Sequence, residues 1–147
     1  MDRRELLHVG LTAIAGTALV PSAAAASQAS ATAPSPSRTL GVHSLGAPLQ
    51  GWTGTMLEVV YAPGQVSASH QHPGPTFGYV VKGSIKWAID GQPATTLTPG
   101  QTFFEPLGSV HSTSANASAT EPAVISVVIV GKSGEPLSKP ATAKPGD

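Results

Sequence analysis

The stretch Gly64-Gln-Val-Ser-Ala-Ser-His70-Gln-His72-Pro-Gly-Pro-Thr76-Phe-Gly-Tyr-Val-Val-Lys-Gly83 decides the fold of this chain. Its two histidines stand two residues apart, and on a β-strand this spacing places both imidazoles on one face. A second block, from Gly100 to His111, supplies a third histidine. Three neutral imidazoles that converge on one point are a typical ligand set for a divalent transition metal. The sequence therefore predicts a metal site with His70, His72 and His111 as its ligands.

The composition of the 147 residues limits the classes of protein that fit. The formal net charge is zero and 11% of the residues are charged, so no basic stripe is available to hold nucleic acid. The 16 glycines and 14 prolines suit many short strands better than long helices. Cysteine is absent, which excludes disulfides and thiolate ligands. A metal must therefore be held by nitrogen and oxygen atoms.

The N-terminal segment is expected to be an export signal. Arg3 and Arg4 precede a short apolar run over residues 9–20, and Ala24-Ala25-Ala26 offers a small-residue cleavage site. The run is shorter than the roughly 20 residues that a membrane-spanning helix needs. The paired arginines resemble a twin-arginine signal, the bacterial route for folded proteins, and the alternative is a Sec signal. We expect residues 1–26 to be removed, which leaves a periplasmic or secreted chain without a stable membrane span.

The rest of the chain divides into a leader, one folded domain and a tail. Residues 27–37 are polar and of low complexity, and residues 132–147 carry three prolines among Lys, Ser and Thr, so both segments are predicted to be flexible. In residues 38–131 short apolar or alternating runs recur between turn signals, and no amphipathic helix appears. About nine strands are expected, hence an antiparallel all-β barrel or double sheet. The predicted strands are Leu40–Leu45, Thr53–Tyr61, Ser67–His72, Phe77–Val81, Ser84–Ile89, Gln92–Leu97, Thr102–Glu105, Val110–Ser114 and Ala123–Val130.

Turn signals connect these runs. Lys82-Gly83 is expected to close a hairpin between its two flanking strands, and Asp90-Gly91 is a strong signal for a second tight turn. Glycines at predicted strand ends suit turns that need a positive φ. This expectation applies to Gly64, Gly83, Gly100 and Gly108.

The spacing of the two blocks resembles the two motifs of the cupin family. Gly64-x5-His70-x-His72-x3-Thr76-x6-Gly83 follows the first motif except at Thr76, where the family usually has a glutamate ligand. Gly100-x5-Pro106-x-Gly108-x2-His111 follows the second motif. The resemblance implies an antiparallel cupin or jelly-roll barrel, a double-stranded β-helix, with a metal near its centre. It also implies a small-molecule ligand or substrate and, as in many single-domain bacterial cupins, a homodimer.

The departure at Thr76 leaves the fourth metal ligand open, because a hydroxyl group is a poor replacement for a carboxylate. The centre is completed by water alone, by Thr76 acting through water, or by another carboxylate. Glu105 directly precedes Pro106 in the strand that leads to the third histidine. It is the candidate for a further ligand or for the hydrogen-bond partner of a histidine N–H. On family grounds, iron or manganese ranks before nickel or zinc.

Aromatic side chains are expected to pack the barrel or line its pocket. Phe77 and Tyr79 are two residues apart and therefore share one face of their strand. Trp87 and Phe103 lie in two other predicted strands. We take these four residues as candidate pocket walls.

Two classes of function remain open. The first is an exported metal-dependent enzyme, of the non-haem iron dioxygenase type, that acts on a small organic molecule. Three histidines leave positions on the metal for substrate and O2. The second is a non-catalytic periplasmic module that binds or senses a small ligand or a metal. The scarcity of acid–base residues in the first block favours this second class.

Overall fold

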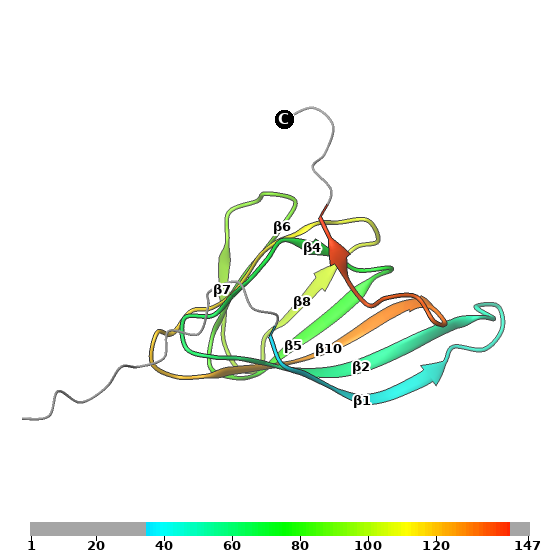
Figure 1. Cartoon of the computed structure of the whole chain (residues 1–147), viewed down its shortest axis with the longest axis horizontal. Coiled ribbons are helices and arrows are strands. Elements are labelled where there is room, and N and C mark those ends of the chain that lie inside the picture. Colours follow the sequence, from blue (N-terminus) through cyan, green and yellow to red (C-terminus); the bar gives the residue numbers. More distant parts are fainter. Residues whose placement is uncertain (1–34, 142–147) are drawn as a thin grey trace, which may run out of the picture.

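Two antiparallel β-sheets that face each other make up residues 35–141, the part of the chain that the computed structural model describes (Figure 1). The first sheet has the order β1-β2-β10-β5-β8, and the second has the order β11-β4-β9-β6-β7 with β3 paired to β9. Within these residues no helix is long and apolar enough to cross a membrane. The strands are β1 (Ser37–Ser44), β2 (Trp52–Tyr61), β3 (Val66–Ser67), β4 (His70–Gln71), β5 (Thr76–Lys82), β6 (Ile85–Ile89), β7 (Thr95–Leu97), β8 (Thr102–Glu105), β9 (His111–Asn116), β10 (Ala123–Lys132) and β11 (Lys139–Pro140).

The architecture confirms the predicted all-β, double-stranded β-helix class. The core forms where the inner faces of the two sheets meet, and β10 shows the pattern most clearly because buried residues alternate along it. β10 is paired on one side with β2 and on the other with β5, so its buried side chains lie at the centre of the inner face of the first sheet. The buried apolar cluster consists of Leu57, Tyr61, Val80, Ile85, Leu97, Phe103, Ala123, Ile125, Val127 and Ile129. The predicted export signal, residues 1–26, and most of the leader lie outside the described residues.

The predicted hairpin around Lys82-Gly83 is wrong. The strand before it, β5, pairs with β10 and β8, whereas the strand after it, β6, pairs with β9 and β7 in the other sheet. Gly83 instead carries the chain from one sheet to the other with φ 74°, and a Cβ there would lie 2.8 Å from the Cα of Ala123. The close approach and the positive φ both require glycine.

The other turn predictions agree with the structure. Asp90 and Gly91, with φ values of 52° and 71°, join the antiparallel pair β6 and β7. The predicted strand Ser67–His72 is divided into β3 and β4, which both pair with β9. The four glycines predicted to need a positive φ all have one: Gly64, Gly83, Gly100 and Gly108.

Residues 137–141, which we call the C-terminal strap, lie against the barrel. Lys139 pairs with Gln71 and Pro140 with His70, and the side chain of Leu137 packs against the buried apolar cluster. This arrangement differs from the flexible tail predicted for residues 132–147, of which the structure describes those up to 141. A single leucine among prolines and polar residues shows no periodicity, so the sequence pattern gave no sign of this anchor.

The outward-facing side of the first sheet, which we call the outer face, is unusually apolar. Met56, Val128, Phe77 and Phe104 are direct neighbours across four adjacent strands. The rings of Phe77 and Phe104 stack with their centroids 4.9 Å apart. Phe77 is 52% exposed, and Phe104 and Met56 are also exposed. An apolar patch of this kind on a folded domain indicates an interaction surface.

Candidate metal centre

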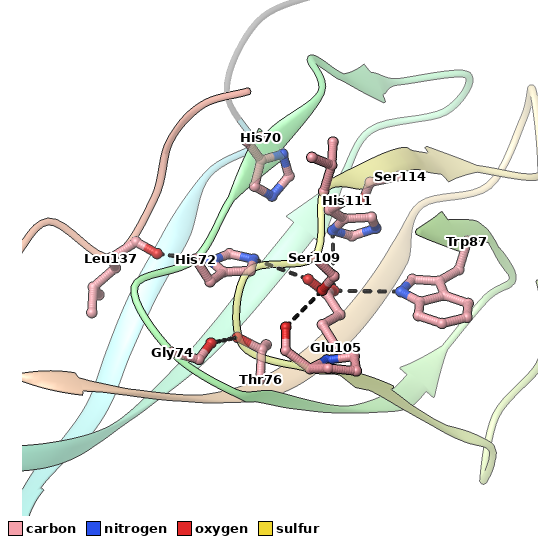
Figure 2. A network of polar contacts seen from close by, with 12 residues as sticks. His70, His72, Gly74, Thr76, Trp87, Glu105, Ser109, His111, Ser114 and Leu137 are labelled. Carbon is pink, nitrogen blue, oxygen red and sulfur yellow. Dashed lines mark hydrogen bonds and ion pairs between the residues drawn. The ribbon is translucent and has the colours of Figure 1, made fainter. Parts of the chain in front are cut away.

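The three histidines predicted from the sequence meet at one point of the second sheet. His70 lies in β4 directly opposite His111 at the start of β9, and His72 follows two residues later. Each ring offers one ligand atom, and these atoms all lie within 4.8 Å of one another. Figure 2 shows the three rings pointing toward a common centre. The three residues could therefore hold a metal ion.

Two of the rings are oriented by backbone carbonyl groups. The Nδ1 atom of His70 lies 2.7 Å from the carbonyl oxygen of Ala68, and that of His72 lies 2.7 Å from the carbonyl oxygen of Leu137 in the C-terminal strap. A ring nitrogen so close to a carbonyl oxygen carries the proton and donates it. The Nε2 atom of each neutral ring is then left with a free lone pair. This is the usual way in which proteins prepare histidine ligands.

The third ring has no such partner. His111 is 4% exposed, and neither of its ring nitrogens makes a well-aligned hydrogen bond, although the backbone of Thr113 lies close enough to raise the pKa of the ring slightly against the effect of burial. Its Nδ1 atom lies 3.2 Å from Oε1 of Glu105, but this contact lacks the direction that an N–H···O bond requires. Buried polar atoms without partners are costly and rare in folded proteins. A metal ion bound by this ring would supply the missing partner, so the arrangement fits a metal.

A buried carboxylate completes the cluster. Glu105 in β8 is 2% exposed, and its Oε2 atom lies 3.6 Å from Nε2 of His72. The indole Nε1 of Trp87 donates a hydrogen bond of 3.4 Å to Oε1 of Glu105. Figure 2 shows the carboxylate between these groups and His111. Glu105 thus touches two of the three histidines, although it lies outside the group of atoms that are mutually within 4.8 Å.

Glu105 lies directly beside Thr76, the residue that departs from the first motif. The two residues are a direct cross-strand pair between β5 and β8, so their side chains leave the sheet on the same face. Thr76 is 1% exposed, and its hydroxyl donates to the carbonyl oxygen of Gly74 at 3.4 Å. A carboxylate therefore lies next to Thr76 on the inner face of the neighbouring strand.

Burial sets the charge state of the cluster. It raises the pKa of Glu105 to about 7, and the hydrogen bond from Trp87 opposes part of this rise. Burial, together with the nearby rings of His70 and His72, lowers the pKa of His111 to about 3. The pKa of His72 is also lowered, mainly by burial. Near neutral pH the rings of His72 and His111 are therefore uncharged, which is the state that a metal requires.

A cavity of about 510 Å³ opens beside the cluster. The three histidines of the second sheet line it, with Glu105 beside them at the edge of the first sheet, and the C-terminal strap borders it. The opposite wall consists of aliphatic side chains from β2 and β10. This volume lies within the range of about 300–1,000 Å³ that is usual for small-molecule sites. The aliphatic wall is made by Leu57, Val59, Ile125, Val127 and Ile129.

The four aromatic residues considered as pocket walls are placed differently from one another. Phe103 lines the cavity, whereas Trp87 stacks on Phe103 at 5.5 Å and supports Glu105 from behind. Phe77 and Tyr79 lie on the outer face, and this corrects their assignment to the pocket. Because Thr76 points inward, alternation along β5 places both aromatic residues outward.

The sequence reasoning missed several residues of the site, among them Tyr61 and Leu137. Tyr61 lines the cavity, is 4% exposed, and its hydroxyl lies 2.6 Å from that of Ser114. Its spacing of two from Val59 and four from Leu57 was the signal that could have revealed it. Leu137 had no such signal, because its carbonyl group acts on His72 across 65 residues of sequence.

Comparisons with known proteins agree with this fold. A family model described as "Cupin domain" matches residues 57–130. An uncharacterized conserved protein with a double-stranded β-helix domain from Klebsiella pneumoniae superimposes with a TM-score of 0.55 and 23% identity, over 72% of this chain and 85% of its own. A cupin-like protein from Thermotoga maritima gives a TM-score of 0.55 and 21% identity, over 71% of this chain and 74% of its own.

A third similar structure is a known enzyme. The DMSP lyase DddQ from Ruegeria pomeroyi superimposes with a TM-score of 0.51 and 24% identity, over 60% of this chain. The present chain spans 43% of the length of that lyase. At these identities the likeness shows the fold alone. No curated protein matches the chain at a significant level.

Proposed function

Because this chain belongs to the cupin family, we propose that it is a metal-dependent enzyme that acts on a small organic molecule. The observation that carries this proposal is the meeting of three histidine ligand atoms within 4.8 Å at the wall of a cavity of about 510 Å³. The metal is iron or manganese, with nickel or zinc as alternatives, held by His70, His72 and His111. The reaction is an oxidation that uses O2.

Each part of the chain has a defined role in this proposal. A bound divalent metal would supply open coordination positions for substrate and O2 and would polarise a bound oxygen atom. The carbonyl groups of Ala68 and Leu137 hold the rings of His70 and His72 with Nε2 free. Trp87 holds the carboxylate of Glu105 beside two of the rings, where it is a further ligand or orients the ring of His111. The aliphatic wall limits the access of water.

The second candidate is a non-catalytic module that binds a small ligand or a metal. One observation favours it: Glu105 is the single carboxylate among the described residues that line the cavity. An enzyme that relies on general acid–base chemistry usually places more than one titratable group beside its substrate. In a dioxygenase the metal can carry the reaction without a second carboxylate, so we rank the enzyme first.

Elemental analysis of the natively exported protein, followed by turnover assays under O2, tests the proposal. We expect about one iron or manganese ion per chain and oxidation of at least one member of a phenolic and thiol panel. Turnover should be lost when the metal is removed and should return when it is added back. His43→Ala serves as the control, because His43 lies in β1 away from the cluster. A metal-bound protein without turnover supports the binding module, and a protein that binds no first-row metal contradicts both candidates.

Export to the periplasm or the medium is a separate part of the proposal. It is supported by the paired arginines, the short apolar run and the alanines of residues 1–26, all outside the described structure. Replacing Arg3 and Arg4 with lysine should keep the precursor in the cytoplasm. Normal export of that variant would indicate the Sec route instead.

The outer face supports a homodimer. Its charged pair, Arg38 and Glu58, forms an ion pair of 3.2 Å within one chain, so two such faces can meet without like charges opposing each other. A stable interface needs about 800 Å² from each partner, which a five-stranded sheet can supply. Light scattering should show a dimer that Phe77→Glu dissociates. Val66→Glu is the matched control, because Val66 is 42% exposed but belongs to the other sheet. A monomeric parent protein would contradict the dimer.

A further inference from the structure

The cavity has two chemically opposite walls. On one side the three histidines of the second sheet and Glu105 of β8, the edge strand of the first sheet, present ring nitrogens and carboxylate oxygens. On the first sheet β2 and β10 present only hydrocarbon along the cavity, apart from the hydroxyl of Tyr61. That hydroxyl is already bonded to Ser114. A molecule that fills the cavity therefore meets metal ligands at one end and an aliphatic surface at the other.

The aliphatic wall is continuous. Val127 lies directly opposite Leu57, and Ile125 lies directly opposite Val59, so the four side chains share one face of the antiparallel pair. Leu57, Ile125 and Val127 are each less than a tenth exposed. Hydrocarbon placed against such a wall is removed from water, which stabilises the complex in proportion to the buried apolar area.

Apart from the buried hydroxyl groups of Thr76 and Tyr61, which lie against Gly74 and Ser114, the polar groups of the cavity outside the metal cluster lie near its rim. They are hydroxyl groups on partly or fully exposed residues of β1, of residues 67–69 and of the C-terminal strap. Lys139 is the single lysine or arginine among the described lining residues, and it is exposed. A second anionic group placed deep in the cavity would find no cation against the aliphatic wall. Burying such a group without a partner is strongly unfavourable.

We propose that the site selects small monoanions with an aliphatic body, such as short-chain monocarboxylates, with the carboxylate at the metal and the chain against β2 and β10. This inference rests on the proposed metal centre, which receives the head group. It goes further by naming the substrate class and the residues that select it: Leu57, Val59, Ile125, Val127 and Ile129. Dianions and polyols of the same length are rejected, because the aliphatic wall offers them no polar partner.

The test measures binding rather than turnover. The mature chain is first titrated with Mn²⁺ by calorimetry, and the metal-loaded protein is then titrated with acetate, butyrate, hexanoate and octanoate. We expect the affinity to rise about two- to fourfold for each added methylene until the cavity is filled. Succinate and adipate have the same chain lengths as butyrate and hexanoate but carry a second carboxylate at the far end. They should bind at least about tenfold more weakly than those monoanions.

A pair of variants on one strand assigns the effect to the wall. Val127→Thr puts a hydroxyl of almost unchanged size into the cavity wall, and we expect it to flatten the dependence on chain length. Val128→Thr places the same change on the outer face of the same strand, next to Met56 and Phe77, and should leave the dependence as in the parent. Both variants are checked for unchanged Mn²⁺ stoichiometry. The chain-length series on the parent protein gives its own answer if Val127→Thr does not fold.

Each outcome is decisive. A steep dependence on chain length, weak binding of dianions and a flattened slope for Val127→Thr alone support the inference. A flat series, or dianions that bind as well as monoanions, overturns it while leaving the metal centre intact. Failure of the first Mn²⁺ titration, repeated with Fe²⁺, overturns the proposed metal centre and with it this inference.

Discussion

The two walls of the cavity differ in how they contribute to the stability of the fold. The wall on β10 buries hydrocarbon in regular alternation, so each side chain there stabilises the folded state. The wall on β4, β8 and β9 buries His111 and Glu105, and the two ring nitrogens of His111 have no well-aligned hydrogen bond. Such burial costs free energy until a ligand supplies the missing partner. One wall therefore holds the barrel together, and the other depends on what it binds.

Removing a ligand from the polar wall should have the largest effect. A structural metal site contributes about 10–16 kcal/mol through its ligands, so His111→Ala should weaken metal affinity on the order of 1,000-fold. The added metal should then no longer raise the melting temperature, since only binding to the folded state stabilises it. Calorimetric titration and thermal melts measure both effects. His43→Ala should change neither, and retention of parent-like affinity in His111→Ala would refute the proposed centre.

A large-to-small substitution in the apolar wall should lower the stability of the fold but leave metal binding unchanged. Ile125→Ala is expected to lower the free energy of unfolding by about 2–5 kcal/mol, because Ile125 is 3% exposed within the core. The metal stoichiometry should stay as in the parent, because Ile125 is not one of the candidate ligands. Urea denaturation and elemental analysis together distinguish the two walls. If Ile125→Ala loses its metal but keeps the stability of the parent, the division of roles between the two walls is wrong.

The pH dependence of the metal-free protein should reveal the carboxylate of the polar wall. The pKa of Glu105 is raised from 4.5 to about 7 in the folded state. Its contribution to the free energy of unfolding is therefore fully present below pH 4.5 and is lost as the pH rises through about 7. Glu105→Gln removes this ionisation. We expect the unfolding free energy of the variant, relative to that of the parent, to rise by about 3 kcal/mol between pH 5 and pH 8. Urea titrations at both pH values measure it, and a pH-independent difference would count against the buried, raised carboxylate.

The pH dependence of stability that His111 contributes has the opposite sign. Its pKa is lowered from 6.5 to about 3, so its contribution is present above pH 6.5 and is lost as the pH falls toward 3. The previous experiment compares pH 5 with pH 8, both above the pKa of about 3 for His111, so the ring is uncharged at either pH.

The smallest effect is expected at the C-terminal strap. Leu137→Ala removes the apolar anchor but keeps the carbonyl group that orients His72. The loosened carbonyl should lower metal affinity about tenfold, as is common for groups that orient a histidine ligand. Calorimetric titration detects this change. Leu107→Ala, at a leucine that is 66% exposed, is the control and should have no effect. Equal affinities of the two variants would show that the strap does not position His72.

Local pattern predicted some of this fold well. The spacing of His70, His72 and His111 depends only on strand alternation and on the resemblance to the two motifs, and the structure brings these rings together. The glycine turns also follow from local backbone chemistry. The hairpin at Gly83 failed because the choice of strand partner is a tertiary property. Two strands adjacent in sequence here belong to different sheets.

Register explains what the sequence left open at the site. Glu105 was one of several candidates for completing the centre, and only its pairing with Thr76 places its carboxylate beside the histidines. The same register turns Phe77 and Tyr79 outward, against their assignment to the pocket. Because a shift of one residue reverses the face of every side chain, spacing within a strand cannot by itself say which face is inside.

The hydrogen bond between His72 and the carbonyl oxygen of Leu137 joins two positions 65 residues apart. During synthesis, from the N-terminus onward, Leu137 emerges only after every strand that carries a metal ligand. Strands β1 to β10 of the barrel are therefore all synthesised before the carbonyl group that orients His72 becomes available. A chain that has been cut between the barrel and Leu137 would be folded but poorly metallated. The amount of bound metal would then distinguish intact chains from chains cut before Leu137. An experimenter could measure this without an activity assay.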